Sequence, residues 1–168
     1  MDPKFLKKIF KYFLILFFVQ SSLSAKSIKC NFEEVYPNQQ IQEGLILIQN
    51  EKIRYEYSDK NLYTLLYTSD LNLYLVENQN RENIQAIESN KEIFSNLLKL
   101  YDQYPNLNNS INIDEFQFTI EKSEIFNFFK RIAVKSKQVN FSLYFHNCDQ
   151  IEIDYKLFNP RPFKEIIF

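Results

Sequence analysis

The feature that most restricts the fold is an alternation of apolar and polar side chains in short runs. A period of two residues is typical of β-strands that bury one face. The clearest run is QVNFSLYFHN (138–147), in which apolar side chains on one face alternate with polar ones on the other. The other runs are IQEGLILIQ, KIRYEYSD, NLYTLLYTSD, LNLYLVENQ, INIDEFQFTIE, KRIAVKS and QIEIDYKLF. Turn residues separate most of them, at Ser58–Asp59, Ser69–Asp70, Asn78–Asn80 and Asn147–Asp149. The sequence therefore predicts an antiparallel meander with one apolar face.

One segment, IESNKEIFSNLLKLYDQYP, has helical periodicity instead. Its apolar residues recur every three or four positions, at Ile93, Phe94, Leu97, Leu98 and Tyr101. Ser89 and Glu92 have the spacing of a capping box, and Pro105 follows the last apolar residue. We expect a helix from Asn90 to Tyr104 that packs its apolar stripe on the sheet. The predicted fold class is mainly β, a curved antiparallel sheet or half-barrel with one or more covering helices.

The first 25 residues have the layout of a secretory signal peptide. Four lysines come first, an apolar run from Tyr12 to Val19 follows, and Ser21 to Ala25 supplies small residues. The apolar run is shorter than the roughly 20 residues of a membrane span. We expect cleavage after Ser24 or Ala25. The mature chain would then be a soluble periplasmic protein with a single domain, residues 26–168. The alternative is an uncleaved N-terminal anchor.

Charge and cysteine content narrow the classes of partner. Without residues 1–25 the chain has 16 basic and 20 acidic side chains, a net charge of −4. An acidic chain is not expected to bind nucleic acid or an anionic membrane as its main partner. Cys30 and Cys148 form a disulfide in an oxidising compartment only if the fold brings them together, and the sequence leaves that open.

Groups that could support catalysis are scarce. His146 is the only histidine, and we expect it to be exposed beside a turn. A chain with one glycine has no glycine-rich phosphate loop. Glu152 and Asp154 share a strand face in the predicted pattern, as a carboxylate pair for acid–base chemistry would, but a solvated strand face is the commoner meaning. We therefore expect no enzymatic activity, no catalytic residue, no cofactor and no metal site.

The stretch NFEEVYPNQQIQEGLILIQNEKIRYEYSDKNLYTLLYTSDLNLYLVENQNRENIQAI resembles the LolA family, the periplasmic carriers of outer-membrane lipoproteins. Members of this family have a first strand that contains a Phe, followed by a strand led by Gly. A segment that contains Arg, an aromatic position and Tyr comes next, and then a hairpin that displays an aromatic residue. The matching positions are Phe32, Gly44, the segment Arg54-Tyr55-Glu56-Tyr57 and Leu73-Tyr74. We expect Gly44 to mark a bulge or bend and Arg54 to be solvated beside Glu56.

Three features depart from the family pattern. Only Lys26 to Lys29 lies between the expected cleavage site and Cys30, where members have an N-terminal helix. Asn50 and Glu51 stand where many members have a basic residue followed by proline. The C-terminal part, which ends in FNPRPFKEIIF, is short.

The resemblance implies a monomeric carrier that holds the acyl chains of lipoproteins in a hydrophobic half-barrel. Its partners would be an inner-membrane ABC lipoprotein exporter and an outer-membrane lipoprotein receptor. A periplasmic binder of free lipid or another hydrophobic ligand, and an envelope protein-interaction module, remain alternatives with the same fold. The candidate lining consists of inward-facing side chains, which would otherwise form an ordinary core: Leu45, Leu47, Ile53, Tyr55, Tyr57, Leu73, Phe94, Leu97, Leu98, Tyr101, Phe116, Phe118, Phe141, Leu143 and Phe145. Ile46 and Ile48 replace Leu45 and Leu47 if the register shifts.

Overall fold

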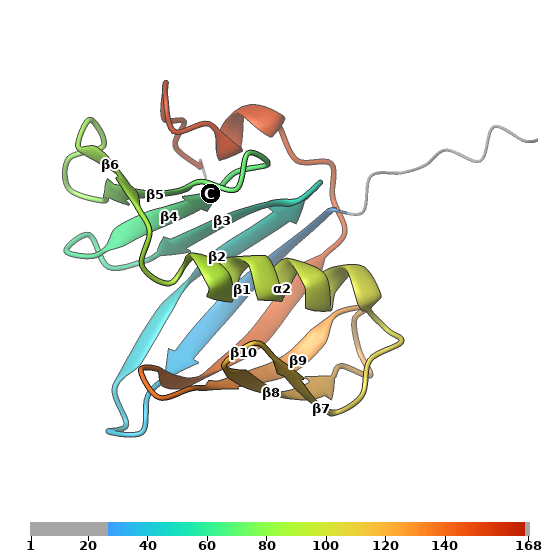
Figure 1. The fold of residues 1–168 in the computed structure, drawn as a ribbon. Coiled ribbons are helices and arrows are strands. Elements are labelled where there is room, and N and C mark those ends of the chain that lie inside the picture. The colour runs from blue at the N-terminus through green and yellow to red at the C-terminus, as the bar shows by residue number, and fades with distance from the viewer. Residues whose placement is uncertain (1–26, 167–168) are drawn as a thin grey trace, which may run out of the picture.

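The computed structural model describes residues 27–166, in which a ten-stranded antiparallel sheet curves around one α-helix (Figure 1). The strands are β1 (Ser27–Val35), β2 (Ile41–Gln49), β3 (Lys52–Tyr57), β4 (Tyr63–Tyr67), β5 (Leu73–Glu77), β6 (Ile84–Ile87), β7 (Ser110–Ile113), β8 (Phe116–Lys122), β9 (Phe129–Lys135) and β10 (Asn140–Asp149). Their order in the sheet is β6-β5-β4-β3-β2-β1-β10-β9-β8-β7. The predicted signal peptide lies outside the described residues.

The topology is two meanders joined by the pairing of β1 with β10. Within residues 27–166 no ladder connects β6 to β7, so the sheet remains open and these strands are its edges. The predicted mainly β, antiparallel fold is therefore confirmed. The sequence runs that were expected as strands correspond to β2–β5 and β7–β10, whereas β6 lacks a clear alternation and was not expected.

Helix α2 (Lys91–Gln103) agrees with the expected helix to within one residue at each end. The predicted capping box is wrong, because Asn90 is the N-cap residue and has a left-handed backbone, with φ 64°, and no side chain caps the helix. A capping box needs an extended backbone at the N-cap. The helix lies across the sheet in Figure 1, and we call the face that it covers the inner face. Its buried residues include Phe94, Leu97 and Leu98, which join the large apolar cluster of the sheet.

The C-terminal run QIEIDYKLF is not a strand, which corrects the sequence prediction. After β10 the chain continues without regular structure to a short 3-10 helix, η1 (Tyr155–Phe158). Ile153 and Phe158 pack on Leu45 and Leu47, on the face of the sheet opposite the helix, which we call the outer face. Residues 150–166, the C-terminal segment, thus supply the apolar cover of the outer face over β2 and β3. The alternation in this run reflects contact with the outer face of the sheet and not membership of the sheet.

Cys30 of β1 and Cys148 of β10 form a disulfide, so the question that the sequence left open is answered. The pairing of β1 with β10 shifts in register between Lys29 and Asn31. Two residues of β10, Asn147 and Cys148, therefore stand opposite one residue of β1, Cys30. Asn147 has a positive φ of 51°, typical of the extra residue in a β-bulge. In an uninterrupted strand Cys148 would point away from Phe145, to the outer face. The bulge returns Cys148 to the side of Cys30, so the predicted turn at Asn147–Asp149 is instead a bulge within β10.

Gly44 allows a close approach and not a bulge, in contrast to the sequence prediction. The pairing of β2 with β1 and with β3 passes through Gly44 without a shift in register. The Phe32 ring lies over this position: a Cβ atom here would stand 2.4 Å from Cζ of Phe32 and 2.2 Å from the carbonyl oxygen of Glu56. Both distances are far below van der Waals contact, so only glycine fits beneath the ring.

We expect Gly44→Ala to destabilise the protein, because the added methyl group must displace the Phe32 ring and the backbone of β3. Overpacking of a close-packed interior typically costs about 1–3 kcal/mol. Urea denaturation of the variant beside the parent protein measures this loss in the free energy of unfolding. Equal midpoints for the two proteins would contradict the close approach.

Candidate functional site

A cavity of about 400 Å³ lies between helix α2 and the inner face of the sheet. Its rim includes the exposed residues Pro37, Asn90, Gln138 and Asn140, so the cavity opens to solvent between the helix start and the β9–β10 hairpin. Its walls are mainly apolar and aromatic. The remaining lining residues are Glu34, Tyr36, Tyr55, Tyr57, Tyr63, Leu65, Ile93, Phe94, Leu97, Val139, Phe141 and Leu143.

The structure brings six of the predicted lining residues together around this cavity. They come from three parts of the fold: Tyr55 and Tyr57 from β3, Phe94 and Leu97 from α2, and Phe141 and Leu143 from β10. Seven others are buried in the apolar core of the inner face and do not line this cavity: Ile53, Leu73, Leu98, Tyr101, Phe116, Phe118 and Phe145. Most of the helix–sheet interface is therefore closed core, and the cavity occupies one end of it.

Leu45 and Leu47 were assigned to the wrong face. Leu45 pairs with Glu56 and Leu47 with Arg54, so these side chains share the outer face of the sheet. Directly opposed residues of antiparallel strands project to the same side. Ile46 and Ile48, the alternatives for a shifted register, lie on the inner face and belong to its core. The sequence could not decide between the pairs because β2 is apolar on both faces.

A carboxylate and three tyrosine hydroxyl groups form the polar part of the cavity wall. Glu34 of β1 is only 5% exposed. The hydroxyl groups of Tyr55 and Tyr57 donate to its Oε2 atom, at 2.7 and 2.6 Å, and the hydroxyl of Tyr36 donates to Oε1. Hydrogen bonds to an ionised acceptor are the stronger kind, so these three contacts hold the carboxylate in place.

The rings of these tyrosines belong to a continuous aromatic cluster. Tyr55 stacks on Phe32 with ring centroids 4.0 Å apart, and its ring meets that of Tyr57 edge-on at 5.2 Å. Tyr63 continues the cluster at 5.3 Å from Tyr57, also edge-on. Such edge-to-face contacts fix ring orientation beyond the effect of burial alone. The cavity wall is therefore rigid at this end, with its ring faces and its one carboxylate in a defined arrangement.

The tyrosines act as hydrogen-bond donors at this site. Burial raises the pKa of Tyr55 and of Tyr57 well above 10.0, and the negative charge of Glu34 raises it further. Burial and the hydrogen bond to Glu34 raise the pKa of Tyr36 as well. These hydroxyl groups stay protonated at neutral pH, so they remain neutral donors to the carboxylate of Glu34.

We expect alkaline pH to unfold the protein through these tyrosines. A tyrosine whose pKa is raised by folding stabilises the native state fully below its unfolded pKa, about 10, and loses this contribution as pH rises above it. Absorbance at 295 nm should show a group of tyrosines that ionise only together with the loss of circular dichroism. Titration of every tyrosine near pH 10 in a folded protein would contradict their burial.

Glu34 was not among the residues predicted from the sequence, although the pattern of β1 contains a signal for it. Glu34 is in phase with Cys30 and Phe32, the inward positions of β1, so a charged residue stands where the pattern demands an apolar one. Tyr36, two residues later, supplies one of its donors. The other donors come from β3, and their approach to Glu34 depends on the register of three strands, which the sequence alone does not give.

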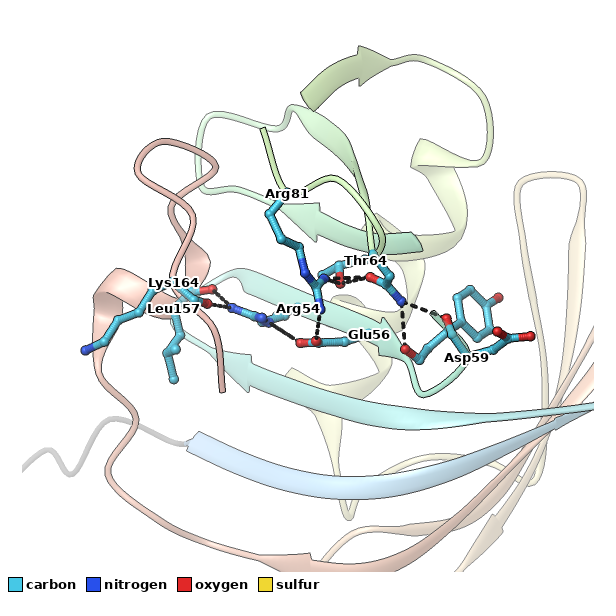
Figure 2. A network of polar contacts seen from close by, with 9 residues as sticks. Arg54, Glu56, Asp59, Thr64, Arg81, Leu157 and Lys164 are labelled. Atoms are coloured by element: carbon cyan, nitrogen blue, oxygen red, sulfur yellow. Dashed lines mark hydrogen bonds and ion pairs between the residues drawn. The ribbon is translucent and has the colours of Figure 1, made fainter. Parts of the chain in front are cut away.

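The predicted solvated position of Arg54 is also wrong, because Arg54 is fully buried on the outer face. Its Nε and Nη2 atoms donate to Oε2 of Glu56, at 2.9 and 2.6 Å. Its Nη1 atom donates to the carbonyl oxygens of Leu157 and Lys164 in the C-terminal segment, at 3.0 and 2.7 Å. Figure 2 shows this guanidinium group between β3 and the segment. Arg54 therefore ties the C-terminal segment to the sheet.

A second cation and a ring complete this outer network. Nη2 of Arg81 lies 3.2 Å from Oε1 of Glu56. The guanidinium groups of Arg54 and Arg81 lie 4.5 and 5.1 Å from the ring centroid of Phe163, within the range of a cation–π contact. Burial lowers the pKa of Arg54, whereas the charge of Glu56 counteracts this effect.

We expect Arg54→Met to weaken the fold and to release the C-terminal segment. Removal of one partner of a buried ion pair typically costs about 3–5 kcal/mol, and here Glu56 and the two carbonyl groups lose the donors of Arg54. Urea denaturation measures the stability, and limited trypsin digestion at Lys156 and Lys164 reports on the segment. Arg131→Met is the control: its ion pair with Glu121 is partly exposed, and exposed pairs contribute about 0–1 kcal/mol. Equal losses in both variants would contradict the buried role of Arg54.

His146 is half-buried and not exposed. Glu152 and Asp154 do not share a strand face: Asp154 caps η1 by accepting from the backbone N–H of Lys156. Among residues 27–166 no three His, Cys, Asp or Glu side chains are grouped as a metal site would require. In the same part of the chain no helix is long and apolar enough to cross a membrane.

No protein-family model and no curated protein matches the chain. The comparisons therefore identify no family.

Proposed function

We propose that the protein is a carrier of hydrophobic ligands that takes an acyl chain into the cavity under helix α2. The observation that carries this proposal is a cavity of about 400 Å³, open at its rim, in an otherwise closed helix–sheet interface. Ligand sites are typically concave, mainly apolar and about 300–1,000 Å³ in volume, with a few fixed polar groups. An interface that served stability alone would be filled by side chains.

The cavity volume agrees with one acyl chain. A CH₂ group is about the size of a water molecule, which occupies about 30 Å³ in the liquid. A cavity of about 400 Å³ therefore holds roughly 13 CH₂ groups. Transfer of each CH₂ group out of water contributes about 0.8 kcal/mol, which drives entry of the chain. Entry of a second chain requires α2 to move away from the sheet. The free energy of that movement opposes binding, so the ligand can be released again.

The acylated ligand that we propose is an outer-membrane lipoprotein. The sequence resemblance to the LolA family supports this cargo, together with transfer in the periplasm from an inner-membrane ABC exporter to an outer-membrane receptor. The Cys30–Cys148 disulfide agrees with an exported protein, since such bonds form in oxidising compartments. The half-barrel description agrees with the open, curved sheet and with helix α2, which covers its inner face.

One difference from the LolA pattern has a structural explanation. Asn50 and Glu51 form the two-residue turn between β2 and β3, with φ values of 45° and 62°. Turns of this kind need a positive φ at both central residues. Proline, with φ fixed near −65°, cannot stand at Glu51. The basic residue and proline of many family members therefore require a different turn, and the proposal does not depend on them.

The test is a variant that fills the cavity without disturbing the core. Leu97 lines the cavity, so Leu97→Trp places a larger side chain inside it. We expect the affinity for a palmitoylated peptide, measured by fluorescence titration, to fall about tenfold or more, since a loss of 1.4 kcal/mol corresponds to a factor of ten. The thermal midpoint should not fall, because the new side chain occupies empty space.

The matched control is Glu92→Trp, which places the same side chain on the exposed side of the same helix. It should bind as the parent protein does. A folded Leu97→Trp protein with unchanged affinity would refute the carrier proposal. Mass spectrometry of material purified from the periplasm then identifies the cargo. Co-purified acylated lipoprotein supports the lipoprotein carrier, and free lipid supports the lipid binder. Co-purified protein without lipid supports the interaction module.

A further inference from the structure

The carboxylate of Glu34 lies where a ligand in the cavity would meet it. It belongs to the lining, and the exposed rim residues Pro37 and Asn140 belong to the same cavity. Tyr36, which donates to Oε1 of Glu34, is itself half-exposed. Glu34 is thus near the mouth, whereas Leu65, Phe94 and Leu97 form an apolar wall beneath the helix. A ligand with a polar end and a chain would place its polar end at Glu34.

Among residues 27–166, Glu34 has hydrogen-bond donors but no cationic partner. The ion pairs among residues 27–166 involve Glu56, Glu88, Glu121 and Asp154, and Glu34 is not one of them. The three tyrosine hydroxyl groups are neutral and leave its charge uncompensated. A buried charge is strongly disfavoured unless an opposite charge balances it. Glu56 on the outer face differs from Glu34 in this respect, because two arginines form ion pairs with it.

The aromatic rings add a second preference for a cation. Tyr36, Tyr55, Tyr57, Tyr63 and Phe141 all line the cavity with Glu34. The faces of aromatic rings attract cations, and a group of such rings beside a carboxylate is the typical arrangement for an ammonium group. An anionic headgroup, by contrast, would be repelled by Glu34. A neutral headgroup would gain hydrogen bonds only.

We propose that the cavity selects amphiphiles that carry an ammonium group, with the cation against Glu34 and the tyrosine rings and the acyl chain under helix α2. This inference rests on the proposed carrier function and specifies its ligand. The ammonium group comes either from the headgroup of an aminophospholipid or from the free α-amino group of a lipopeptide, which share this chemistry.

The first experiment compares headgroups at constant chain length on the whole protein. Dodecylammonium, dodecyltrimethylammonium, an uncharged dodecyl oligo(ethylene glycol) ether and dodecanoate are titrated below their micelle concentrations by calorimetry. We expect both cations to bind about tenfold or more tightly than the uncharged ether, and dodecanoate to bind more weakly than the ether. Equal affinities for the cations and the ether would overturn the inference and leave the carrier proposal standing. If none of the four probes binds, both the ammonium inference and the carrier proposal are overturned.

The second experiment tests Glu34 itself. Glu34→Gln keeps the shape of the side chain and removes its charge, so the ammonium preference should disappear while affinity for the uncharged ether stays the same. Glu33→Gln is the control: Glu33 is the neighbour in β1 that points to the other face, and the preference should persist. A folded Glu34→Gln protein that still prefers ammonium would overturn the inference. If this variant does not fold, the headgroup series on the parent protein decides the matter alone.

Two further probes separate the sources of the amine. A lipopeptide with a free α-amino group is compared with the same lipopeptide after N-acetylation, and lysophosphatidylethanolamine is titrated beside them. Tighter binding of the free lipopeptide than of its acetylated form supports a lipopeptide ligand, and tighter binding of lysophosphatidylethanolamine than of either supports an aminophospholipid. Equal and weak binding of all three would overturn the inference.

Discussion

The central strands of this sheet are buried on both faces, and the rest of the structure depends on that condition. Successive side chains of a strand point to opposite sides, so five consecutive buried residues in β3 require cover above and below. Helix α2 provides the cover on the inner face, and the C-terminal segment provides it on the outer face. Because the outer side of β3 is charged, its cover must also supply polar partners. The carbonyl groups that accept from Arg54 meet this need.

The two faces solve the problem of buried charge in different ways. On the outer face, the carboxylate of Glu56 is paired with the guanidinium groups of two arginines. On the inner face, Glu34 is held by neutral hydroxyl groups only. The first arrangement belongs to the fold, since it joins segments far apart in the sequence. The second surrounds a space that the chain does not fill, which is why we assign it to ligand recognition.

Local patterns in the sequence predicted most of the fold. The strands were found by their alternation and the helix by its apolar stripe, because both patterns follow from one-sided burial. The failures on the outer face share a cause. In β2 and in the C-terminal segment the alternation does not reveal which surface an apolar side chain contacts, so Leu45 and Leu47 were placed on the wrong face and residues 150–158 were assigned to a strand. Arg54 was assigned to solvent because its cover comes from residues about a hundred positions later.

The short outer strands have a consequence for how the protein behaves at high concentration. An open sheet exposes unpaired backbone N–H and C=O groups along both edges, and these can pair with the edge of another molecule. The edge strands β6 and β7 are only four residues long, the shortest in the sheet. Carboxylate residues flank them, with Glu82 and Glu88 beside β6 and Asp114 after β7. Short edges bordered by like charges give a second copy little to pair with, which opposes edge-to-edge polymerisation of the open sheet.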